Sequence, residues 1–209
     1  MLSKIKKIKN KKFLGKKIFL KKINNYHCNK KYLSWLKDKN INQYLETRWT
    51  TYNIKSLKKF VNSCNSSESI ILFGIFNDKE HIGNIKIEIN RNHSFCYLGY
   101  FIGEKSYHGK KLASEAIRIC CYVVFKLLNL RMCFAGVYSV NKPGIKVLEK
   151  NKFKKVSSIK NLYKIRNNLY ADELTYCLKK IDFKYIQKKN NIFLFNKVDY
   201  IISKNETLF

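Results

Sequence analysis

The chain has 209 residues, enough for one domain with a modest extension, and 45% of them are hydrophobic. It carries 43 Lys and Arg residues against 14 Asp and Glu residues, a formal net charge of +29, yet it also holds 14 Phe and 14 Tyr residues. This apolar and aromatic content excludes an intrinsically disordered chain and predicts a folded core.

The amino-terminal part predicts a tail, a strand and two short helices. Residues 1–12 are rich in lysine and predict a mobile basic tail, and residues 16–23 predict the first strand. Apolar residues then recur at helical spacing around residues 32–36 and again around residues 54–61. The second of these helices has a polar start near Asn53, which is typical of a helix N-terminus.

The middle of the chain changes to strand-like patterns. Runs of β-branched and aromatic residues, separated by short polar turns, predict three strands at residues 69–76, 81–89 and 94–102. The shortness of the turns between them predicts an antiparallel meander.

From Gly109 the apolar period becomes helical and stays so to Leu127. A second helix holds Pro143 in its first turn, which is a favoured early position. Three more strands are predicted at residues 132–138, 153–158 and 170–178. The element order is therefore βααβββαβαββ, an α/β fold with a mixed sheet. Residues 181–209 form an extension that predicts only an appended pair of strands or helices.

The cysteines and the apolar runs indicate the compartment. Seven cysteines contain no C-x-x-C pair, and only four histidines accompany them. This pattern predicts buried, reduced thiols and no metal site. The basic amino end lacks the continuous apolar core of a signal peptide, and the apolar runs are too short to cross a bilayer. We therefore expect a cytoplasmic protein without a membrane partner.

The excess of lysine allows two interpretations. Arginine is rare whereas Asn, Ile, Tyr and Phe are abundant, so an AT-rich coding sequence would explain lysine as the common surface residue. Alternatively, the positive field attracts polyanions such as nucleotides, acidic glycans or nucleic acid. A nucleic-acid-binding protein is the weaker hypothesis, because the basic residues are spread along the whole chain and no RNA-binding signature occurs.

A basic turn that contains Gly109 stands directly before a predicted helix. Such a turn gathers free backbone N–H groups and the positive end of the helix dipole. Together these bind a phosphate group without the need for any one side chain. The chain is therefore expected to hold a phosphorylated cofactor.

Three segments carry a resemblance to a known family. They are GYFIGEKSYHGKKLASEAI at residues 99–117, VYSVNKPGIKVLEKNKF at residues 137–153 and YADELTYCLKK at residues 170–180. Together they resemble the Gcn5-related N-acetyltransferases (GNAT), and within that superfamily the RimJ/RimL-like branch. The resemblance implies a domain over residues 13–180 and a mixed central sheet with helices on both faces. It also implies transfer of an acetyl group from acetyl-CoA to an amine.

The same resemblance implies which residues hold acetyl-CoA. They are Ile102, Gly103, His108, Gly109, Lys110, Lys111, Leu112, Ala113, Ser114 and Asn141. Backbone groups of Ile102 and Gly103 would pair with the pantetheine amides, and the loop from His108 to Ala113 would hold the pyrophosphate. Asn141 resembles the family residue that hydrogen-bonds the pantetheine arm. It equally suits the cap of the helix that follows, and it can do both.

This chain departs from the family pattern at four positions. His108 replaces the usual Gln or Arg, and Lys111 replaces the central Gly of the loop. The Lys111 side chain either obstructs the pyrophosphate or contacts it through its ammonium. Leu148 stands where many members have a Tyr, and Gly144 where RimL-like members have a Ser. The general acid is therefore left to water or to Tyr138, and a catalytically silent CoA-binding protein stays an alternative.

Three residues are predicted on the acceptor side, where an amine must lose a proton before it attacks. Glu46 and Arg48 lie in the loop between the first two helices, which borders the acceptor pocket in this family. Glu46 is the candidate base and Arg48 the candidate ligand of a phosphate or carboxylate, although each also suits a surface ion pair. Tyr97, on the central strand where many RimL-like chains have Glu, is expected either to order a proton-relaying water or to pack in the core.

The acceptor favoured by the sequence is a nucleotide-linked amino sugar of surface-polysaccharide synthesis. The segments NQYLETRW and GYFIGEKSYHGK resemble members with that role, and a basic cleft suits a sugar diphosphate. A protein N-terminal amine, on a ribosomal protein for example, also fits the branch. We expect direct transfer in a ternary complex, in a monomer or homodimer, with the thioester placed where the strand at residues 94–102 parts from the strand at residues 132–138.

Overall fold

The computed structural model describes residues 1–78 and 80–183. A mixed sheet lies at its centre, with strand order β1-β2-β3-β4-β5-β6-β8-β7. The strands are β1 (Phe13–Leu14), β2 (Phe19–Lys22), β3 (Ile70–Asn77), β4 (Glu80–Asn90), β5 (Phe95–Ile102), β6 (Met132–Tyr138), β7 (Lys154–Arg166) and β8 (Leu169–Lys179). Neighbouring strands are antiparallel except β5 and β6, which are parallel. The predicted α/β fold with a mixed sheet is confirmed.

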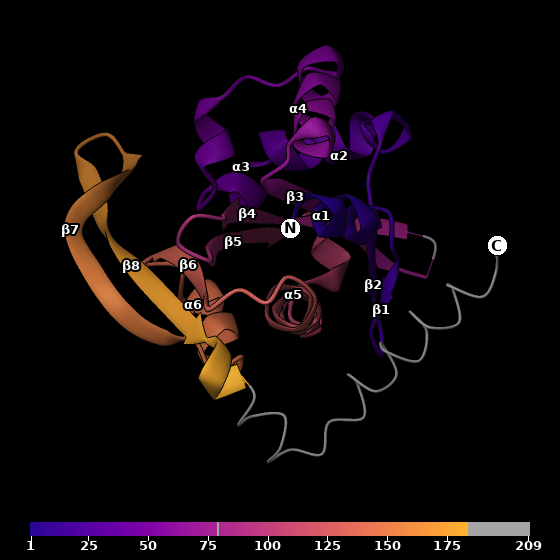
Figure 1. Ribbon diagram of the computed structural model, residues 1–209. Helices are drawn as coiled ribbons and strands as arrows, with labels where there is room; N and C mark the ends of the chain where they lie inside the picture. Colours follow the sequence, from indigo (N-terminus) through magenta and orange to yellow (C-terminus); the bar gives the residue numbers. More distant parts are fainter. Residues whose placement is uncertain (79, 184–209) are drawn as a thin grey trace.

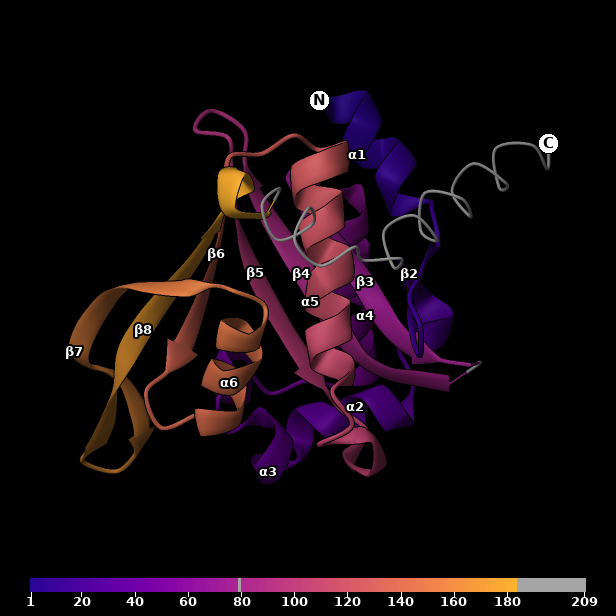
Figure 2. The same cartoon turned by 90° about the horizontal axis from the view of Figure 1, so that it is seen from below.

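Helices cover both faces of this sheet. They are α1 (Leu2–Lys9), α2 (Lys30–Lys37), α3 (Lys39–Asn42), α4 (Ile54–Ser66), α5 (Leu112–Tyr122) and α6 (Lys142–Lys150). Figure 1 shows α2, α3 and α4 on one face and α5 and α6 on the other. Seen from below, α5 crosses the middle of the sheet and α6 lies beside it, next to β6 and β8 (Figure 2). The buried core accordingly has two parts, one on each face.

The two long helices follow the apolar spacing of the sequence. Leu57, Val61 and Cys64 form the buried side of α4, and the Asn53 side chain caps its start by accepting a hydrogen bond from the Ser56 N–H at 2.9 Å. One π-helical turn (Val123–Leu127) continues α5. The helical period predicted through residue 127 is therefore present as one continuous segment.

The amino-terminal residues form helix α1 in place of the expected mobile tail. Ile5 and Ile8 lie on one side of α1 and are buried in the same core as α5. The Lys9 ammonium donates hydrogen bonds to the carbonyls of Cys64 (2.9 Å), Asn65 (3.1 Å) and Ser67. A cation at this place satisfies carbonyls left free at the end of α4 and interacts favourably with the helix dipole. Burial and this ion–dipole contact fix a segment whose composition alone is that of a tail.

The β7–β8 hairpin curves out at one edge of the sheet (Figure 1). β8 pairs with β6 along the whole of β6, from Met132↔Lys179 to Tyr138↔Glu173. A short 3-10 helix, Glu46–Trp49, lies near the hairpin, because Arg48 donates a hydrogen bond to the carbonyl of Lys164 in β7. The hairpin therefore forms one wall beside the loop that holds the predicted acceptor-side residues.

The predicted extension at residues 181–209 lies outside the described residues beyond residue 183. No helix in the described part of the chain is long and apolar enough to span a membrane.

Candidate active site

β5 and β6 lie side by side for only three residue pairs, the last of which is Tyr97↔Phe134. β5 continues beside β4 to Ile102, whereas β6 continues beside β8 to Tyr138. The sheet therefore opens between these two strands, at the place where the sequence predicts the thioester.

Backbone groups of alternate β5 residues point into this opening. The Ser94 carbonyl accepts a hydrogen bond from the Arg131 N–H (2.7 Å) on the β6 side, and the Gly103 N–H donates to the Ile82 carbonyl (2.8 Å) on the β4 side. Hydrogen-bonding direction alternates along a strand. Three residues therefore turn their N–H and C=O groups toward the opening: Leu98, Tyr100 and Ile102. The predicted pairing with pantetheine can use the Ile102 N–H, because the Ile102 carbonyl already contacts His108. The Gly103 N–H is bonded within the sheet.

His108 closes the turn that follows β5. Its Nε2 lies 2.9 Å from the carbonyl oxygen of Ile102, so the ring holds the loop against the end of the strand. Gly103 begins this loop and is packed by the Trp35 ring. A Cβ at Gly103 would lie 2.1 Å from that ring, so only glycine fits there.

The loop then enters α5 through two left-handed residues. Gly109 has φ +74°, and Lys111, the residue before the first helical turn, has φ 65° and ψ 13°. The first backbone bond of α5 runs from the Glu115 N–H to the Lys111 carbonyl (3.3 Å). The N–H groups of Leu112, Ala113 and Ser114 thus have no partner within the helix. They stand at the positive end of its dipole, where an anion is stabilised.

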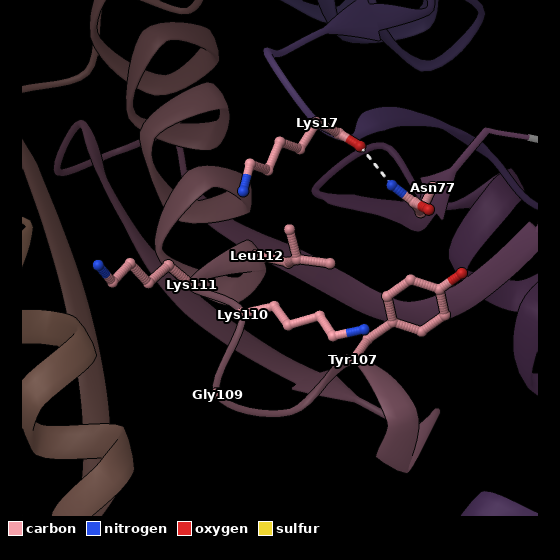
Figure 3. A pocket seen from close by; sticks show the side chains of 7 residues that line it. All are labelled: Lys17, Asn77, Tyr107, Gly109, Lys110, Lys111 and Leu112. Atoms are coloured by element: carbon pink, nitrogen blue, oxygen red, sulfur yellow. Dashed lines mark hydrogen bonds between the residues drawn. The ribbon is translucent and has the colours of Figure 1, made fainter.

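A pocket of about 410 Å³ borders this helix start. Figure 3 shows its lining residues, namely Lys17, Asn77, Tyr107, Gly109, Lys110, Lys111 and Leu112. The Asn77 amide donates to the Lys17 carbonyl (2.7 Å) and joins the two loops that form one side. The Lys110 side chain extends toward Tyr107, with its ammonium 5.1 Å from the ring centroid, whereas the Lys111 side chain points the opposite way (Figure 3).

Two predicted cofactor residues have structural partners. Ser114 is buried, and its Oγ accepts hydrogen bonds from Asn151 Nδ2 (3.0 Å) and Arg118 Nη1 (3.2 Å). Its side chain therefore joins α5 to the end of α6, and its backbone N–H is the group left for a phosphate. Asn141 caps α6, because its Oδ1 accepts from the Gly144 N–H at 3.0 Å. The predicted contact of Asn141 with pantetheine stays a prediction.

On the opposite face of the sheet, Tyr138 at the end of β6 brings Glu46 and Arg48 together. The Tyr138 hydroxyl donates to the Glu46 carboxylate and accepts from an Arg48 Nη at 3.3 Å. Burial and the bond to Glu46 raise the pKa of Tyr138 well above its ordinary value, so the hydroxyl stays protonated at neutral pH. The Arg48 guanidinium also stacks on the Tyr138 and Trp49 rings, at 5.3 and 4.6 Å from their centroids.

Tyr97 lies apart from this group. Its ring is half exposed and contacts Phe95 and Phe134, with centroids 5.7 and 5.6 Å away. Phe134 and Tyr138 are four residues apart on β6, about 13 Å of extended strand. Tyr97 and Glu46 therefore lie at opposite ends of the same face of the sheet, too far apart for direct contact.

A family model described as the acetyltransferase (GNAT) domain matches residues 17–154, which is more than half of the chain. The chain belongs to the GNAT family. This confirms the family predicted from the three sequence segments. The predicted class, acetyl-CoA-dependent acyltransferase, is the class of that family.

The GNAT chain has relatives among curated proteins and solved structures. It is 34% identical over 104 residues to the probable N-acetyltransferase YjcK of Bacillus subtilis (strain 168), an alignment that covers 48% of this chain and 56% of YjcK. The chain thus spans little more than half the length of that relative. A GNAT-family acetyltransferase from Bacillus anthracis superposes with a TM-score of 0.70 at 17% identity, over 82% of this chain and 99% of that one. RimL, a ribosomal L7/L12 alpha-N-protein acetyltransferase in complex with coenzyme A, gives 0.72 at 16% identity, over 81% and 98% of the chains.

The structure shows the surroundings of three residues at which the sequence departs from the GNAT pattern: Lys111, Leu148 and Gly144. The left-handed backbone at Lys111 is the conformation that glycine adopts without strain, which agrees with the glycine that the family resemblance implies at this position. Leu148 is buried in the core, with 1% of its surface exposed, and offers no proton in any case. At Gly144 an added Cβ would lie 2.6 Å from Asn141 Nδ2, so a side chain there requires the cap of α6 to move.

Sequence reasoning missed a second group of polar residues on the acceptor face. Glu173 in β8 is 8% exposed, and the Thr175 hydroxyl lies within hydrogen-bonding distance of both its carboxylate oxygens (2.8 and 3.0 Å). Tyr163 in β7 stacks on Tyr138, with ring centroids 4.1 Å apart. No distinct signal in the sequence pointed to Glu173, because residues of both strand parities along β8 are buried.

Proposed function

We propose that this protein is an N-acetyltransferase that moves the acetyl group of acetyl-CoA to a primary amine. The observation that carries the proposal is the opening between β5 and β6, followed by the unpaired N-terminus of α5 at the end of β5. An opening lined by free backbone groups on one strand suits the two amides of pantetheine, and the helix start suits a diphosphate.

The residues present fit the donor. The N–H groups of Leu112, Ala113 and Ser114 would bind the pyrophosphate oxygens, with Lys17 and Lys110 supplying positive charge from the adjoining pocket. The free backbone groups of Tyr100 and its neighbours on β5 would bind pantetheine. Tyr138, at the end of β6, is the proposed proton donor to the departing thiolate.

For the acceptor we propose a nucleotide-linked amino sugar. A second pocket of about 430 Å³ lies on the acceptor side, and its lining combines cations with aromatic rings: Lys37, Lys39, Arg48, Trp49 and Tyr52 are among its residues. Trp49 is 58% exposed and offers a face for a base, and the lysines suit a diphosphate. The buried Arg48 Nε has no hydrogen-bond partner among the described residues, which leaves one donor for a ligand.

A protein N-terminal amine is the second candidate. The similarity in fold to RimL favours it. A peptide acceptor would not require the cationic and aromatic pocket, whereas a nucleotide sugar would.

An acceptor panel at fixed acetyl-CoA tests the proposal. Release of coenzyme A is followed with a thiol reagent in the presence of UDP-linked amino sugars, basic peptides with a free amino terminus, and simple amines. We expect turnover on the nucleotide sugars. Turnover on peptides alone would replace the proposed acceptor, and stabilisation by coenzyme A without release on any amine would show a silent binding protein.

A pair of double variants tests the pocket itself. Replacement of Lys37 and Lys39 by Gln removes two of its cations and is expected to raise the KM for a nucleotide sugar several-fold at low salt, with less effect at high salt. Replacement of Lys55 and Lys59, which are exposed on α4 and do not line the pocket, is the matched control. An equal rise in both double variants would show a general field effect and no phosphate site.

A further inference from the structure

From the geometry of β6, β7 and β8 we infer that Glu173 accepts the proton of the acceptor amine, a role that no sequence motif assigns to it. The inference rests on the proposed N-acetyltransferase activity and names the residue that prepares the nucleophile. It also gives Glu46 a different role, which is to hold the Tyr138 hydroxyl in position.

The Glu173 carboxylate borders an open point on β6. A Cβ built on Gly136 would lie 3.2 Å from Glu173 Oε1 and 3.7 Å from the Tyr163 hydroxyl, and Gly136 itself is exposed. Because Gly136 has no side chain, the carboxylate and the phenol face a space that a ligand atom can enter. Gly136 is two residues beyond Phe134, where pairing with β5 ends. The carboxylate thus lies next to the opening in which the thioester is proposed to bind.

In the described part of the chain, the Glu173 carboxylate also has no cationic partner. Within residues 1–78 and 80–183 its hydrogen-bond donor is Thr175, and one hydroxyl donates a single proton to one oxygen at a time. No lysine or arginine of that part of the chain forms an ion pair with it. A buried carboxylate without a counter-ion is unfavourable. An incoming ammonium supplies that partner, and transfer of its proton neutralises the carboxylate.

Glu46 is less suited to the task. Its carboxylate already accepts the hydroxyl proton of Tyr138, and Arg48 donates to the same hydroxyl. Glu46 is also exposed, whereas Glu173 is almost completely buried. Two carboxylates therefore divide the work: Glu46 keeps Tyr138 in place, and Glu173 meets the amine.

The proton balance of the step is complete. The acceptor ammonium loses one proton to Glu173, and the neutral nitrogen forms a bond with the carbonyl carbon of the thioester. The carbon–sulfur bond breaks, and the second nitrogen proton passes, directly or through Tyr138, to the departing thiolate. Glu173 then releases its proton to solvent. The products are the amide, the free thiol of coenzyme A and one proton, and no oxidant or metal is needed.

A matched pair of small nucleophiles tests this role. Methylamine and hydroxylamine are similar in size, but at neutral pH methylamine is protonated and hydroxylamine is largely neutral. Coenzyme A release is measured with each, above the uncatalysed rate, and with any acceptor that the panel identifies. We expect Glu173→Gln to lower the rate with protonated amines by about 100-fold or more, the range of a general base, and to leave the hydroxylamine rate within about threefold. The remaining amine rate should rise about tenfold per pH unit, as the free amine does.

The control is Glu149→Gln, which removes a carboxylate that accepts a hydrogen bond from Tyr176 at 3.1 Å outside the site. It should change neither rate. Equal losses of Glu173→Gln on both nucleophiles would show a structural role, and no loss would show that Glu173 takes no proton; either result overturns the inference. Absence of release by the wild-type protein with every acceptor would overturn the proposed function as well. The titratable groups facing the same point, Tyr163, Tyr138 and Glu46, are unchanged in the Glu173 variant.

Discussion

Replacing Lys111 by alanine and by glycine separates two properties of this residue, its backbone conformation and its charge. Lys111 stands in the left-handed region at φ 65° directly before α5, at the position where the GNAT loop has a glycine. Alanine keeps the strained conformation and removes the ammonium. Glycine removes both the ammonium and the strain.

The strain sets the expected difference in stability. A non-glycine residue in the left-handed region costs roughly 1–2 kcal/mol. Glycine gives back about 0.4–1 kcal/mol of this through the larger entropy of the unfolded chain. Lys111→Gly should therefore be more stable than Lys111→Ala by about 0.5–1 kcal/mol, or about 1–4 °C in Tm for a chain of this length.

The charge sets the expected difference in affinity. The Lys111 side chain is exposed and points away from the other pocket residues in Figure 3, so it does not obstruct the helix start. Loss of an exposed cation should weaken coenzyme A binding by up to about fivefold at low salt and by less at high salt.

Calorimetric titration with coenzyme A at two salt concentrations, together with thermal unfolding of the three proteins, measures both effects. An increase in affinity of more than tenfold in Lys111→Gly over the other two proteins would refute this reasoning. It would show that the lysine blocks the pyrophosphate.

Three further predictions concern the acceptor side and stability. Tyr138→Phe removes the hydroxyl that donates to Glu46. We expect kcat to fall about tenfold or more while the Kd for acetyl-CoA is unchanged. An unaltered kcat would exclude Tyr138 as the acid. Gly103→Ala should cost about 1–3 kcal/mol in denaturant unfolding, because a Cβ there would lie 2.1 Å from the Trp35 ring. The control Gly99→Ala should be near neutral, because its Cβ would meet no atom of the described residues within 4 Å. Burial lowers the pKa of His81 to about 4 from the ordinary histidine value of about 6.5, so the folded state binds its proton less readily than the unfolded chain. Stability should then decline as pH falls from about 6.5 to about 4, by at most about 3 kcal/mol from this group, and the decline should be flatter in His81→Gln.

Local pattern was enough to predict most of the scaffold. The strands β3 to β6 and the helices α4 and α5 lie where hydrophobic period and polar turns place them, because each buries one regular face. Helix α1 could not be predicted in this way. Half of its residues are lysine, and what fixes it is the burial of Ile5 and Ile8 together with the contact of Lys9 with carbonyls at the end of α4, more than fifty residues later in the chain.

In the candidate site, too, features set by local sequence could be predicted and contacts between distant segments could not. The turn around Gly109 was predicted from local sequence, and the structure places free N–H groups there. The partners of His108 and Ser114 were not predictable, since one bonds to the end of the preceding strand and the other to the end of α6. Glu173 was missed for the same reason: its neighbours come from β6 and β7, and only the assembled sheet brings them together. The catalytic role of Tyr97 stays a prediction, and for Glu46 we propose the positioning of Tyr138 in place of the predicted role as base.

β5 and β6 separate because each strand pairs more extensively with its other neighbour than with the strand across the opening. β8 pairs with β6 along its full length and β4 pairs with β5 along its full length, whereas β5 and β6 share three pairs. Among the described residues, a ligand that enters the opening therefore breaks no interstrand hydrogen bond, and it meets backbone groups that have no partner across the gap. On the acceptor face, Arg48 donates hydrogen bonds to the Tyr138 hydroxyl and to the Lys164 carbonyl. These bonds hold the loop that contains Arg48 at a fixed distance from the β7–β8 hairpin. The two halves of the sheet thus act as preorganised walls, and placing an amine and a thioester between them supplies much of the expected acceleration.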